Sequence, residues 1–452
     1  MMLNLREAAL AAAGHLVGDG SVAFSRVTTD SRDIRAGDLF VAIRGERFDG
    51  HTFVADALKQ GAVAVLVDAA QPEGNQIVVS DTIAALGGLA SYWRKKLAPT
   101  VVAITGSNGK TTVKEMTATV LSHWAGADAV LATQGNLNNH IGVPLTLLSL
   151  RAQHRYAVVE MGMNHFGEID YLSRLAEPDL ALVNNAGSAH LEALGSVAGV
   201  ARAKGEIFNG LGKNGIAIVN ADDAHADLWA KLANGHKQIT FGATAAEVGA
   251  RAVTLAPQGT QFILSTPRAD AEVALGVPGL HNVRNALAAA AVGYALGMAI
   301  NDIAAGLESY QGVKGRLQPK VAFNGATLID DTYNANPDSM KAAIDVLVNA
   351  GNDTVLVLGD IGEIGEAGPT LHHEIGAYAK ARGVGALYAL GDQMKHAAEA
   401  FVGAHHFADM DALIAALRAR LTPGATVLVK GSRFMRMERV VDALAATAPG
   451  GQ

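Results

Sequence analysis

The stretch TVVAITGSNGKTT, residues 100–112, decides the fold class of this chain. Its first six residues form a continuous apolar run, which is typical of a strand buried on both faces of a parallel sheet. A glycine-rich turn follows at residues 106–109, and a helical pattern begins at Lys110. Such a turn predicts a phosphate-binding loop, because successive backbone N–H groups and the positive end of the helix dipole face one anion.

The residues after the turn carry the chemistry that this loop predicts. Lys110 would reach the β- and γ-phosphates of a nucleotide, and the hydroxyl of Thr111 would ligate Mg²⁺. The usual motif has a glycine five residues before Gly109, where this chain has Ile104. We interpret the loop as a shortened variant in which Gly106 supplies the bend. An ordinary glycine turn is the alternative, but Lys-Thr-Thr directly after a glycine at a strand–helix junction favours a nucleotide site.

Length and composition limit the remaining classes of protein. The chain has 452 residues, of which 50% are apolar and 17% charged. At about 100–200 residues per domain, this predicts two to four folded domains and excludes a largely disordered chain. The absence of cysteine excludes disulfide scaffolds, thiolate metal sites and cysteine nucleophiles. A net charge of −7 argues against broad nucleic-acid binding, so we expect no nucleic-acid partner.

The apolar segments bear on localisation. The longest apolar run, residues 286–300, is 15 residues long, which is shorter than the roughly 20 residues of a membrane-spanning helix. The N-terminal stretch carries Arg6 and Glu7 and lacks a signal-peptide pattern. We therefore expect a cytoplasmic protein that does not insert into membranes.

Alternating strand and helix patterns divide the chain into three blocks. The first, residues 1–81, alternates short β-like runs with a helical stretch at 53–60. The second, residues 82–313, begins with a helix at 82–97 and ends with a helix at 282–296, and the third, residues 314–452, repeats the alternation. This alternation predicts α/β domains with parallel sheets. The expected strands are residues 39–43, 63–67, 77–79, 100–105, 156–161, 180–184, 216–220, 327–330, 354–358, 386–390 and 426–430.

Three residues of the second block are candidates for chemistry near the phosphates. Glu160 ends a predicted strand, where a carboxylate meets ligands at the carboxyl edge of the sheet and can bind Mg²⁺ through oxygen. His190 follows the next strand at the same edge, and Lys204 lies on an apolar helical face. Each also has an ordinary interpretation, as a solvated glutamate, a surface or packing histidine, or a lysine whose stem covers apolar surface. The residues alone leave these alternatives open.

The motifs resemble the Mur ligase family, the ATP-dependent amino-acid ligases of peptidoglycan synthesis, along nearly the whole chain. The resemblance implies a small α/β UDP-binding domain at 1–81, a central P-loop ATPase domain with a parallel sheet at 82–313, and a C-terminal Rossmann-like domain at 314–452 for the incoming amine. The segments that carry it are TDSR (29–32), GDLFVA (37–42), GERFDGH (45–51), the loop 105–112, HNVRN (281–285) and KGR (314–316).

Three segments narrow the resemblance to the MurF branch of the family, namely GNLNNHIGVP (135–144), DTYNANPDS (331–339) and LGDIGEIG (358–365). The MurE branch carries a Tyr-Ala-His-Thr-Pro run at the second of these positions and an Asp-Asn-Pro-Arg motif that this chain lacks. Folylpolyglutamate synthases carry Asp-Gly-Ala-His-Asn-Pro there and lack the UDP-type N-terminal domain. The resemblance therefore implies an ATP-dependent ligase that joins D-alanyl-D-alanine to UDP-N-acetylmuramoyl-tripeptide through an acyl phosphate.

Two alternatives stay open at this point. One is a MurE-like ligase with another amine acceptor, and the other is a nucleotide-dependent regulatory module with a degenerate site. Against the second, this chain has Lys110, Thr111, Glu160, His190, Lys204 and Arg316 together.

The resemblance also assigns roles to single residues. It implies Mg²⁺, and we expect two ions, held by Thr111, Glu160, His190 and a carbamate formed from CO₂ on Lys204. The implied catalytic residues are Lys110, Glu160, His190, Lys204 and Arg316. The implied ATP-binding residues are Gly106, Ser107, Asn108, Gly109, Lys110, Thr111, Thr112, Asn282, Asn285, Arg316 and Asp331. The implied UDP-tripeptide-binding residues are Ser31, Arg32, Asn136, Asn138 and Asn139, and those for D-alanyl-D-alanine are Tyr333, Asn334 and Asn336.

A site divided over three domains implies that the domains close before chemistry. Water in an open site would hydrolyse an acyl phosphate, so we expect a hinge near residues 313–316. We expect the protein to act as a monomer.

Overall fold

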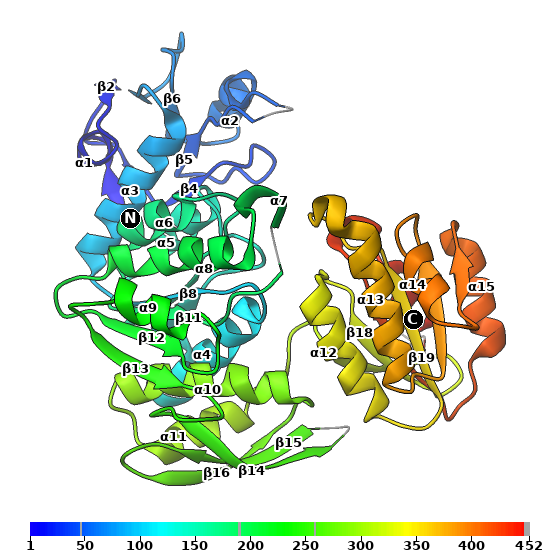
Figure 1. Cartoon of the computed structure of the whole chain (residues 1–452). Coiled ribbons are helices and arrows are strands. Elements are labelled where there is room, and N and C mark those ends of the chain that lie inside the picture. The colour runs from blue at the N-terminus through cyan, green and yellow to red at the C-terminus, as the bar shows by residue number, and fades with distance from the viewer. Residues whose placement is uncertain (46–47, 189–190, 257–258, 447–452) are drawn as a thin grey trace.

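The computed structural model describes residues 1–45, 48–188, 191–256 and 259–446 and confirms the predicted α/β fold class (Figure 1). We call its three larger sheets the N-terminal, central and C-terminal sheets. Each is mainly parallel and is covered by helices. The first two lie against each other, whereas the C-terminal sheet and its helices stand to one side.

The central sheet is built around the strand that precedes the phosphate loop. Its strand order is β13-β12-β11-β8-β10-β9, and neighbouring strands run parallel. Val101 and Ala103 of β8 face one helical layer, because alternate side chains of a strand point to the same face. Val102 and Ile104 face the other layer. The strands are β8 (Thr100–Thr105), β9 (Val130–Ala132), β10 (Tyr156–Glu160), β11 (Leu180–Val183), β12 (Ile216–Asn220) and β13 (Lys237–Phe241).

Two helical layers cover the central sheet. Helices α4, α10 and α11 pack on one face, and α3, α5, α6 and α8 pack on the other. The apolar run at 286–300 lies mostly in α10, whose buried alanines let the helix approach the sheet closely. The helices are α3 (Thr82–Leu97), α4 (Lys110–Ala125), α5 (Gly142–Leu148), α6 (Glu168–Ala176), α7 (Leu191–Leu194), α8 (Val197–Gly205), α9 (Ala226–Leu232), α10 (Leu280–Ala295) and α11 (Ile300–Glu308).

An antiparallel sheet at the foot of this block in Figure 1 was missed by the sequence analysis. Its strands are β14 (Gly249–Ala256), β15 (Gly259–Ser265) and β16 (Asp270–Leu275). Only alternate residues of β15, namely Thr260, Phe262 and Leu264, are buried. A strand that is buried on one face has no continuous apolar run, which was the pattern used to find strands.

The N-terminal sheet has the order β2-β7-β6-β5-β4, in which β2 runs antiparallel to β7. Leu5 and Phe24 of this region share one apolar core with α3 and β8, so the first two blocks pack together without a break. The elements are β1 (Leu3–Asn4), α1 (Leu5–Ala11), β2 (His15–Val17), β3 (Ala23–Phe24), β4 (Arg26–Thr28), β5 (Asp38–Val41), α2 (Val54–Lys59), β6 (Ala64–Val67) and β7 (Gln76–Val78).

The C-terminal sheet has its own two cores. Its order is β17-β18-β22-β19-β20-β21, and β17 runs antiparallel to β18. Leu356 and Leu358 face α12 and α13, whereas Val355 and Val357 face α15 and α16. The strands are β17 (Gln318–Val321), β18 (Thr327–Asp331), β19 (Thr354–Gly359), β20 (Ala386–Leu390), β21 (His405–Phe407) and β22 (Thr426–Lys430). The helices are α12 (Pro337–Val348), α13 (Gly368–Ala381), α14 (Lys395–Ala400), α15 (Met410–Arg420) and α16 (Glu438–Leu444).

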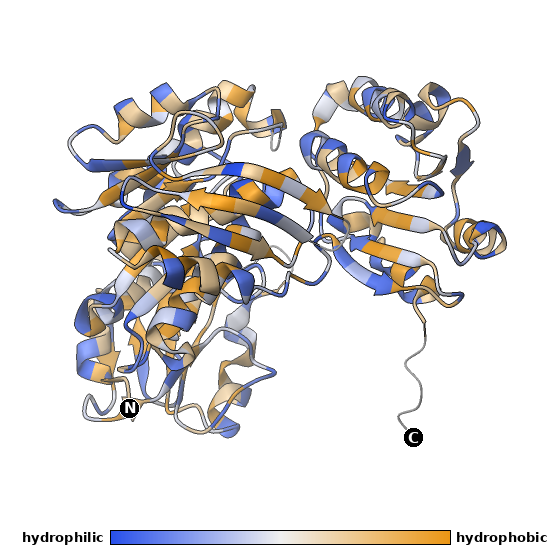
Figure 2. Ribbon diagram, turned by 90° about the horizontal axis from the view of Figure 1, so that it is seen from below, coloured by the Kyte–Doolittle hydropathy of each residue, from blue (hydrophilic) through white to orange (hydrophobic). Residues whose placement is uncertain are grey.

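Hydropathy follows this layering. Apolar residues concentrate along the strands, and polar residues lie on the outer faces of the helices (Figure 2). Among the residues that the structure describes, no helix combines the length and the apolar character needed to span a bilayer.

Candidate active site

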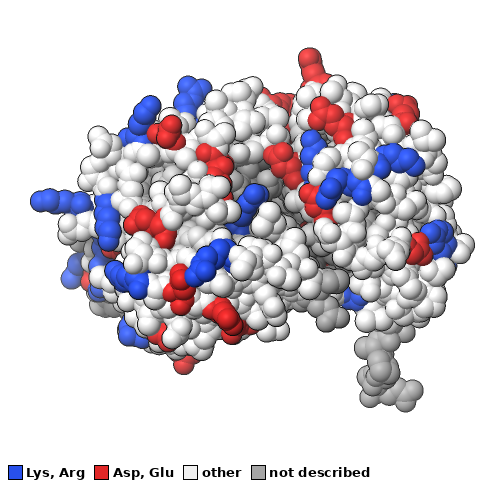
Figure 3. Space-filling view, turned by 60° about the horizontal axis from the view of Figure 1, so that its bottom comes forward, with Lys and Arg blue, Asp and Glu red and all other residues white. Residues whose placement is uncertain are grey.

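A cavity of about 1070 Å³ lies between the central and C-terminal sheets. Figure 3 shows the surface hollowed between the larger and smaller parts of the molecule, with charged side chains of both signs around the hollow. Most of the predicted site residues line it, namely Ser107, Asn108, Gly109, Lys110, Thr112, Asn136, Asn138, Asn139, Glu160, Lys204, Asn282, Asn285, Arg316, Asp331, Tyr333, Asn334 and Asn336. The fold therefore brings together residues that are far apart in the sequence, such as Asn108 and Asn336, which are separated by 228 positions.

The predicted phosphate loop joins β8 to α4 at one wall of the cavity. Gly109 adopts a φ of 76°, which is unfavourable for residues with a Cβ atom. The chain therefore bends at Gly109. Gly106 instead lets the loop lie close to Asn184, because a Cβ atom on residue 106 would lie 2.9 Å from the Cβ of Asn184. The first N–H groups of α4 have no acceptor within the helix and point at this wall, as an anion site requires.

Asn184 and Asn185, directly after β11, clamp the phosphate loop. The N–H of Asn108 donates to Asn185 Oδ1 at 2.8 Å, and the amides of Asn184 and Asn185 donate to the carbonyl of Asn108 at 2.9 and 3.0 Å. Neither residue is among the predicted site residues. Their place at the end of the strand next to β8 is the signal that could have found them. Asn184 also donates from Nδ2 to Asn285 Oδ1 of α10. Asn285 in turn donates from Nδ2 to Asn282 Oδ1.

Lys110 and Lys204 are both withdrawn from solvent beside this loop. Lys110 Nζ donates to the carbonyl of Gly106 at 2.6 Å, so the side chain folds back over its own loop. Burial lowers the pKa of Lys110, and Glu160 opposes that effect. Lys204 on α8 is 1% exposed. Burial lowers the pKa of Lys204 well below its usual value, and the charge on Lys110 acts in the same direction.

Glu160 ends β10 beside β8 and is 3% exposed. Its Oε1 accepts a hydrogen bond from Asn138 Nδ2 at 2.8 Å, while Oε2 is buried and has no hydrogen-bond partner among the described residues. A buried carboxylate oxygen without a donor is costly unless a ligand satisfies it. This oxygen therefore fits a bound cation.

Arg316 reaches across from the chain segment that leads into the C-terminal sheet. Its Nη2 donates to Thr111 Oγ1 at 3.0 Å, and its guanidinium lies 4.5 Å from the ring centroid of Tyr333. Thr111 itself does not line the cavity. The hydroxyl predicted to bind a metal is thus occupied by Arg316 in this conformation.

Helix α12 contributes two further contacts to the central block. Asn336, its N-cap residue, donates from Nδ2 to Asn108 Oδ1 at 2.7 Å. Asp338 accepts from the backbone N–H of Ser188 at 2.8 Å. Asp331, predicted to bind nucleotide, lines the cavity and pairs with Lys430 at 2.7 Å within the C-terminal sheet.

Comparison with known proteins places this arrangement in a family. Three family models match, namely Mur ligase family, catalytic domain at residues 23–94, Mur ligase middle domain at 104–293, and Mur ligase, glutamate ligase domain at 315–433. The chain belongs to the Mur ligase family. The matched segments contain the phosphate loop and most strands of the three larger sheets.

Individual relatives of this Mur ligase match along almost their whole length. The UDP-N-acetylmuramoyl-tripeptide–D-alanyl-D-alanine ligase of Haemophilus influenzae is 44% identical, over 95% of either chain. The solved structure of MurF from Acinetobacter baumannii is 39% identical with a TM-score of 0.92, covering 97% of this chain and 98% of that one. The MurF ligase of Thermotoga maritima, solved in complex with ADP, is 29% identical with a TM-score of 0.84, covering 92% and 96%.

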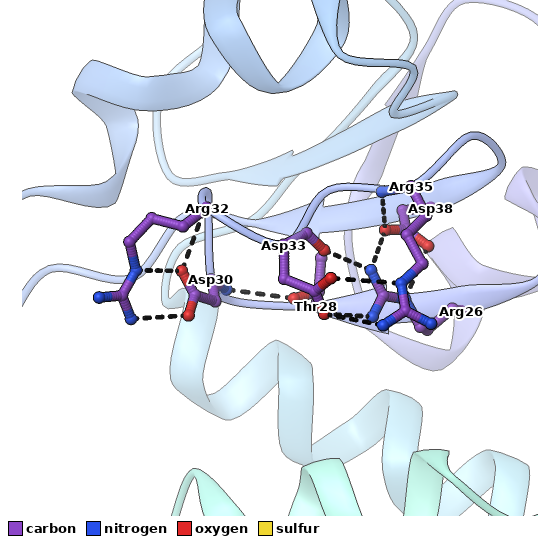
Figure 4. Close-up of polar contacts among 7 residues, drawn as sticks. All are labelled: Arg26, Thr28, Asp30, Arg32, Asp33, Arg35 and Asp38. Carbon is purple, nitrogen blue, oxygen red and sulfur yellow. Dashed lines mark hydrogen bonds and ion pairs between the residues drawn. The ribbon is translucent and has the colours of Figure 1, made fainter. Parts of the chain in front are cut away.

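Two predicted residues of the Mur ligase lie away from the cavity. Ser31 and Arg32 follow β4, and Arg32 lies near a group of acidic and arginine side chains (Figure 4). Arg32 is highly exposed and pairs with Asp30 through two side-chain bonds of 2.8 and 2.7 Å. Arg26 joins Asp38, which is buried, to the exposed Asp33. Of the residues predicted to bind the UDP-tripeptide, Asn136, Asn138 and Asn139 line the cavity, whereas Ser31 and Arg32 do not.

His190 lies outside the residues that the structure describes. Among the described residues of the Mur ligase, no group of three or more His, Asp or Glu side chains is arranged to hold a metal ion. A Mg²⁺ ion that takes most of its ligands from phosphates and water needs no such group.

Proposed function

We propose that this Mur ligase uses ATP to join D-alanyl-D-alanine to UDP-N-acetylmuramoyl-tripeptide, releasing ADP and phosphate. The observation that carries the proposal is the convergence of Lys110, the partnerless oxygen of Glu160, and Arg316 on one cavity. The named relatives support the substrates, and the ADP complex of the Thermotoga enzyme supports the nucleotide. The same relatives favour this function over the MurE-like alternative.

The chemistry begins with a carboxylate, which does not react with an amine at neutral pH because its leaving group is too poor. Transfer of the γ-phosphoryl group of ATP to the tripeptide carboxylate forms an acyl phosphate. The amine of the dipeptide then attacks the carbonyl carbon, and phosphate leaves from a tetrahedral intermediate. The protein contributes mainly position and charge.

Lys110 and Arg316 supply the positive charge that this reaction needs, since two anionic substrates must meet. Lys110 is held over the loop that faces the phosphates. Arg316 would exchange its bond to Thr111 for a phosphate oxygen when ATP binds. Asn282 and Asn285 would line the adenine side of the nucleotide.

The residues present also fit Mg²⁺. Oxygen donors suit this ion, and Glu160 Oε2 is a buried carboxylate oxygen that lacks a donor. Thr111, Glu160 and His190 would hold the metal, which would neutralise phosphate charge when bound. A carbamate on Lys204 would add an anionic oxygen ligand for a second ion. The lowered pKa of Lys204 favours the neutral amine that reacts with CO₂.

Each sheet would then serve one substrate. We assign UDP to residues 1–81, ATP to 82–313 and the dipeptide to 314–452, with Asn136, Asn138 and Asn139 on the tripeptide and Tyr333, Asn334 and Asn336 near the dipeptide. ATP and UDP-linked precursors are cytoplasmic metabolites, so we place the enzyme in the cytoplasm.

Release of phosphate from ATP tests the proposal. The wild-type protein is expected to release phosphate only when purified UDP-tripeptide and D-alanyl-D-alanine are both present. Lys110→Ala should lower the rate by at least about a hundredfold, because it removes charge from the transferring phosphoryl group. The matched control is Lys213→Ala, at an exposed lysine in the turn before β12, which should keep the wild-type rate.

Two outcomes would contradict the proposal. One is full activity of Lys110→Ala. The other is preference for meso-diaminopimelate, lysine or glutamate over D-alanyl-D-alanine when the amines are compared side by side, because the MurE-like alternative predicts such a preference.

A further inference from the structure

A second lysine of α4, Lys114, is buried one turn below Lys110. Residues four apart lie on the same face of a helix, so Lys114 lies deeper in the protein on the face that carries Lys110. It is 1% exposed. Its Nζ bonds to the carboxylate of Glu115 and donates to the carbonyl oxygen of Thr133 at 2.7 Å.

Thr133 connects this lysine to the strand that ends in Glu160. It follows β9 directly and is fully buried. Its N–H donates to Val158 of β10 at 3.0 Å, and its Oγ1 accepts from the N–H of Glu160 at 3.0 Å. The carbonyl of Thr133 accepts from Lys114. Thr133 therefore contacts the end of β10 through both its backbone N–H and its side-chain hydroxyl.

The carboxylate of Glu160 is held from the same segment. The chain continues from Thr133 into the Asn-rich loop, whose Asn138 donates to Glu160 Oε1. The carbonyl of Asn138 accepts from Gly162, two residues beyond Glu160, at 2.8 Å. The positions of the Glu160 backbone and side chain thus both depend on the position of Thr133. Lys114 fixes Thr133 through the hydrogen bond to its carbonyl oxygen.

We propose that Lys114 is a positioning residue for the Glu160 carboxylate, acting through the carbonyl of Thr133. Stability alone is a weak reason for burying the charge of Lys114, since its desolvation is costly and its carboxylate partner Glu115 is 40% exposed. The arrangement instead holds Glu160, whose Oε2 has no hydrogen-bond partner among the described residues, in the wall of the cavity. This inference rests on the proposed function, in which Glu160 binds Mg²⁺.

Four variants separate this role from a purely structural one. Lys114→Met keeps the length of the side chain and removes the charge and the donor. Thr133→Val removes the hydroxyl that accepts from Glu160, and Thr133→Ser keeps it. Thr117→Val is the matched control, because Thr117 is buried on the same helix and its hydroxyl has no partner among the described residues.

Two measurements are made on each folded variant. The first is the Mg²⁺ concentration that gives half-maximal phosphate release. The second is equilibrium binding of Mn²⁺, followed by electron paramagnetic resonance with a non-hydrolysable ATP analogue present. Lys114→Met and Thr133→Val are expected to weaken metal binding by about ten- to a hundredfold, as loss of a group that orients a metal ligand does. Thr133→Ser and Thr117→Val should bind Mn²⁺ like the wild type.

A purely structural role would lower the melting temperature and leave Mn²⁺ affinity unchanged. Wild-type affinity in Lys114→Met and Thr133→Val would therefore overturn the inference. If Lys114→Met does not fold, the contrast between Thr133→Val and Thr133→Ser decides the question. A wild-type protein that needs no divalent cation would instead refute the proposed function, and this inference with it.

Discussion

Lys204 is a buried lysine, and the charge of the nearby, partly buried Lys110 lowers its pKa further. Such a pair is unfavourable unless anions enter the site or one amine changes its chemistry. Phosphates would pair with Lys110. Conversion of Lys204 to a carbamate would replace an amine that is disfavoured as a cation with an anion that attracts Lys110. Both changes remove the same electrostatic penalty, one by binding and one by modification.

A set of Lys204 variants tests the carbamate. Lys204→Ala should lower kcat by about a hundredfold or more, because an anionic group near the reacting phosphoryl group is lost. Added short carboxylic acids should partly restore the phosphate-release rate of this variant. Lys204→Arg keeps a cation that does not form the carbamate, and it should be inactive and resist rescue. An active Lys204→Arg enzyme would mean that the position needs only a positive charge.

Helix α12 shows how one element serves both stability and the site. Asn336 accepts from the N–H of Ser339, and the hydroxyl of Ser339 accepts from the N–H of Asn336, which together form a capping box ahead of Pro337. The amide nitrogen of Asn336 is left to reach Asn108 of the phosphate loop. The amide oxygen of Asn336 therefore caps the helix, and its amide nitrogen makes the contact with the phosphate loop.

Two substitutions of Asn336 separate these tasks. Asn336→Ala removes both contacts and should lower the free energy of unfolding by about 0.5–2 kcal/mol, as loss of an N-cap does. Asn336→Asp keeps an oxygen acceptor for the N–H of Ser339. It should lower the free energy of unfolding by only a few tenths of a kcal/mol, because Asn and Asp are about equally good N-cap residues. Urea denaturation followed by circular dichroism measures the difference. Equal destabilisation by the two variants would show that the cap contributes little here.

At the scale of the whole molecule, few polar contacts join the central block to the part that contains the C-terminal sheet. Arg316 to Thr111, Asn336 to Asn108 and Asp338 to Ser188 are the cross-contacts described above. The two parts have separate apolar cores. Parts that share few contacts and no core are expected to move relative to each other. Substrates would enter while the cavity is open.

A disulfide across this boundary tests the motion. The chain has no cysteine, so Ser188→Cys with Asp338→Cys introduces a single possible bridge. The oxidised double variant should lose turnover, since locked parts do not exchange substrates and products, and a reductant should restore it. Each single variant under the same oxidant is the control. Unchanged turnover in a fully bridged protein would show that opening is unnecessary, and the hinge expected near residues 313–316 would be abandoned.

Local patterns were sufficient for much of the fold. The strand at 100–105, the helix at 82–97 and the strand at 216–220 have their predicted bounds, because a continuous apolar run or a helical period expresses burial within a few residues. The half-buried strands β14–β16 lack that pattern and were missed. The ends of several other strands differ from the predicted bounds by one or two residues.

The sequence by itself determined the three alternating blocks and the phosphate loop, since glycine, lysine and the flanking strand act together within thirteen residues of chain. Only the tertiary structure decided the partners of those residues. Arg316 meets Thr111 across 205 positions and Asn336 meets Asn108 across 228. It also decided that Asp331 pairs with Lys430, that Asn185 clamps the loop, and that Lys114 holds Thr133. Contacts of this kind depend on how sheet edges and helices pack, which no local pattern encodes.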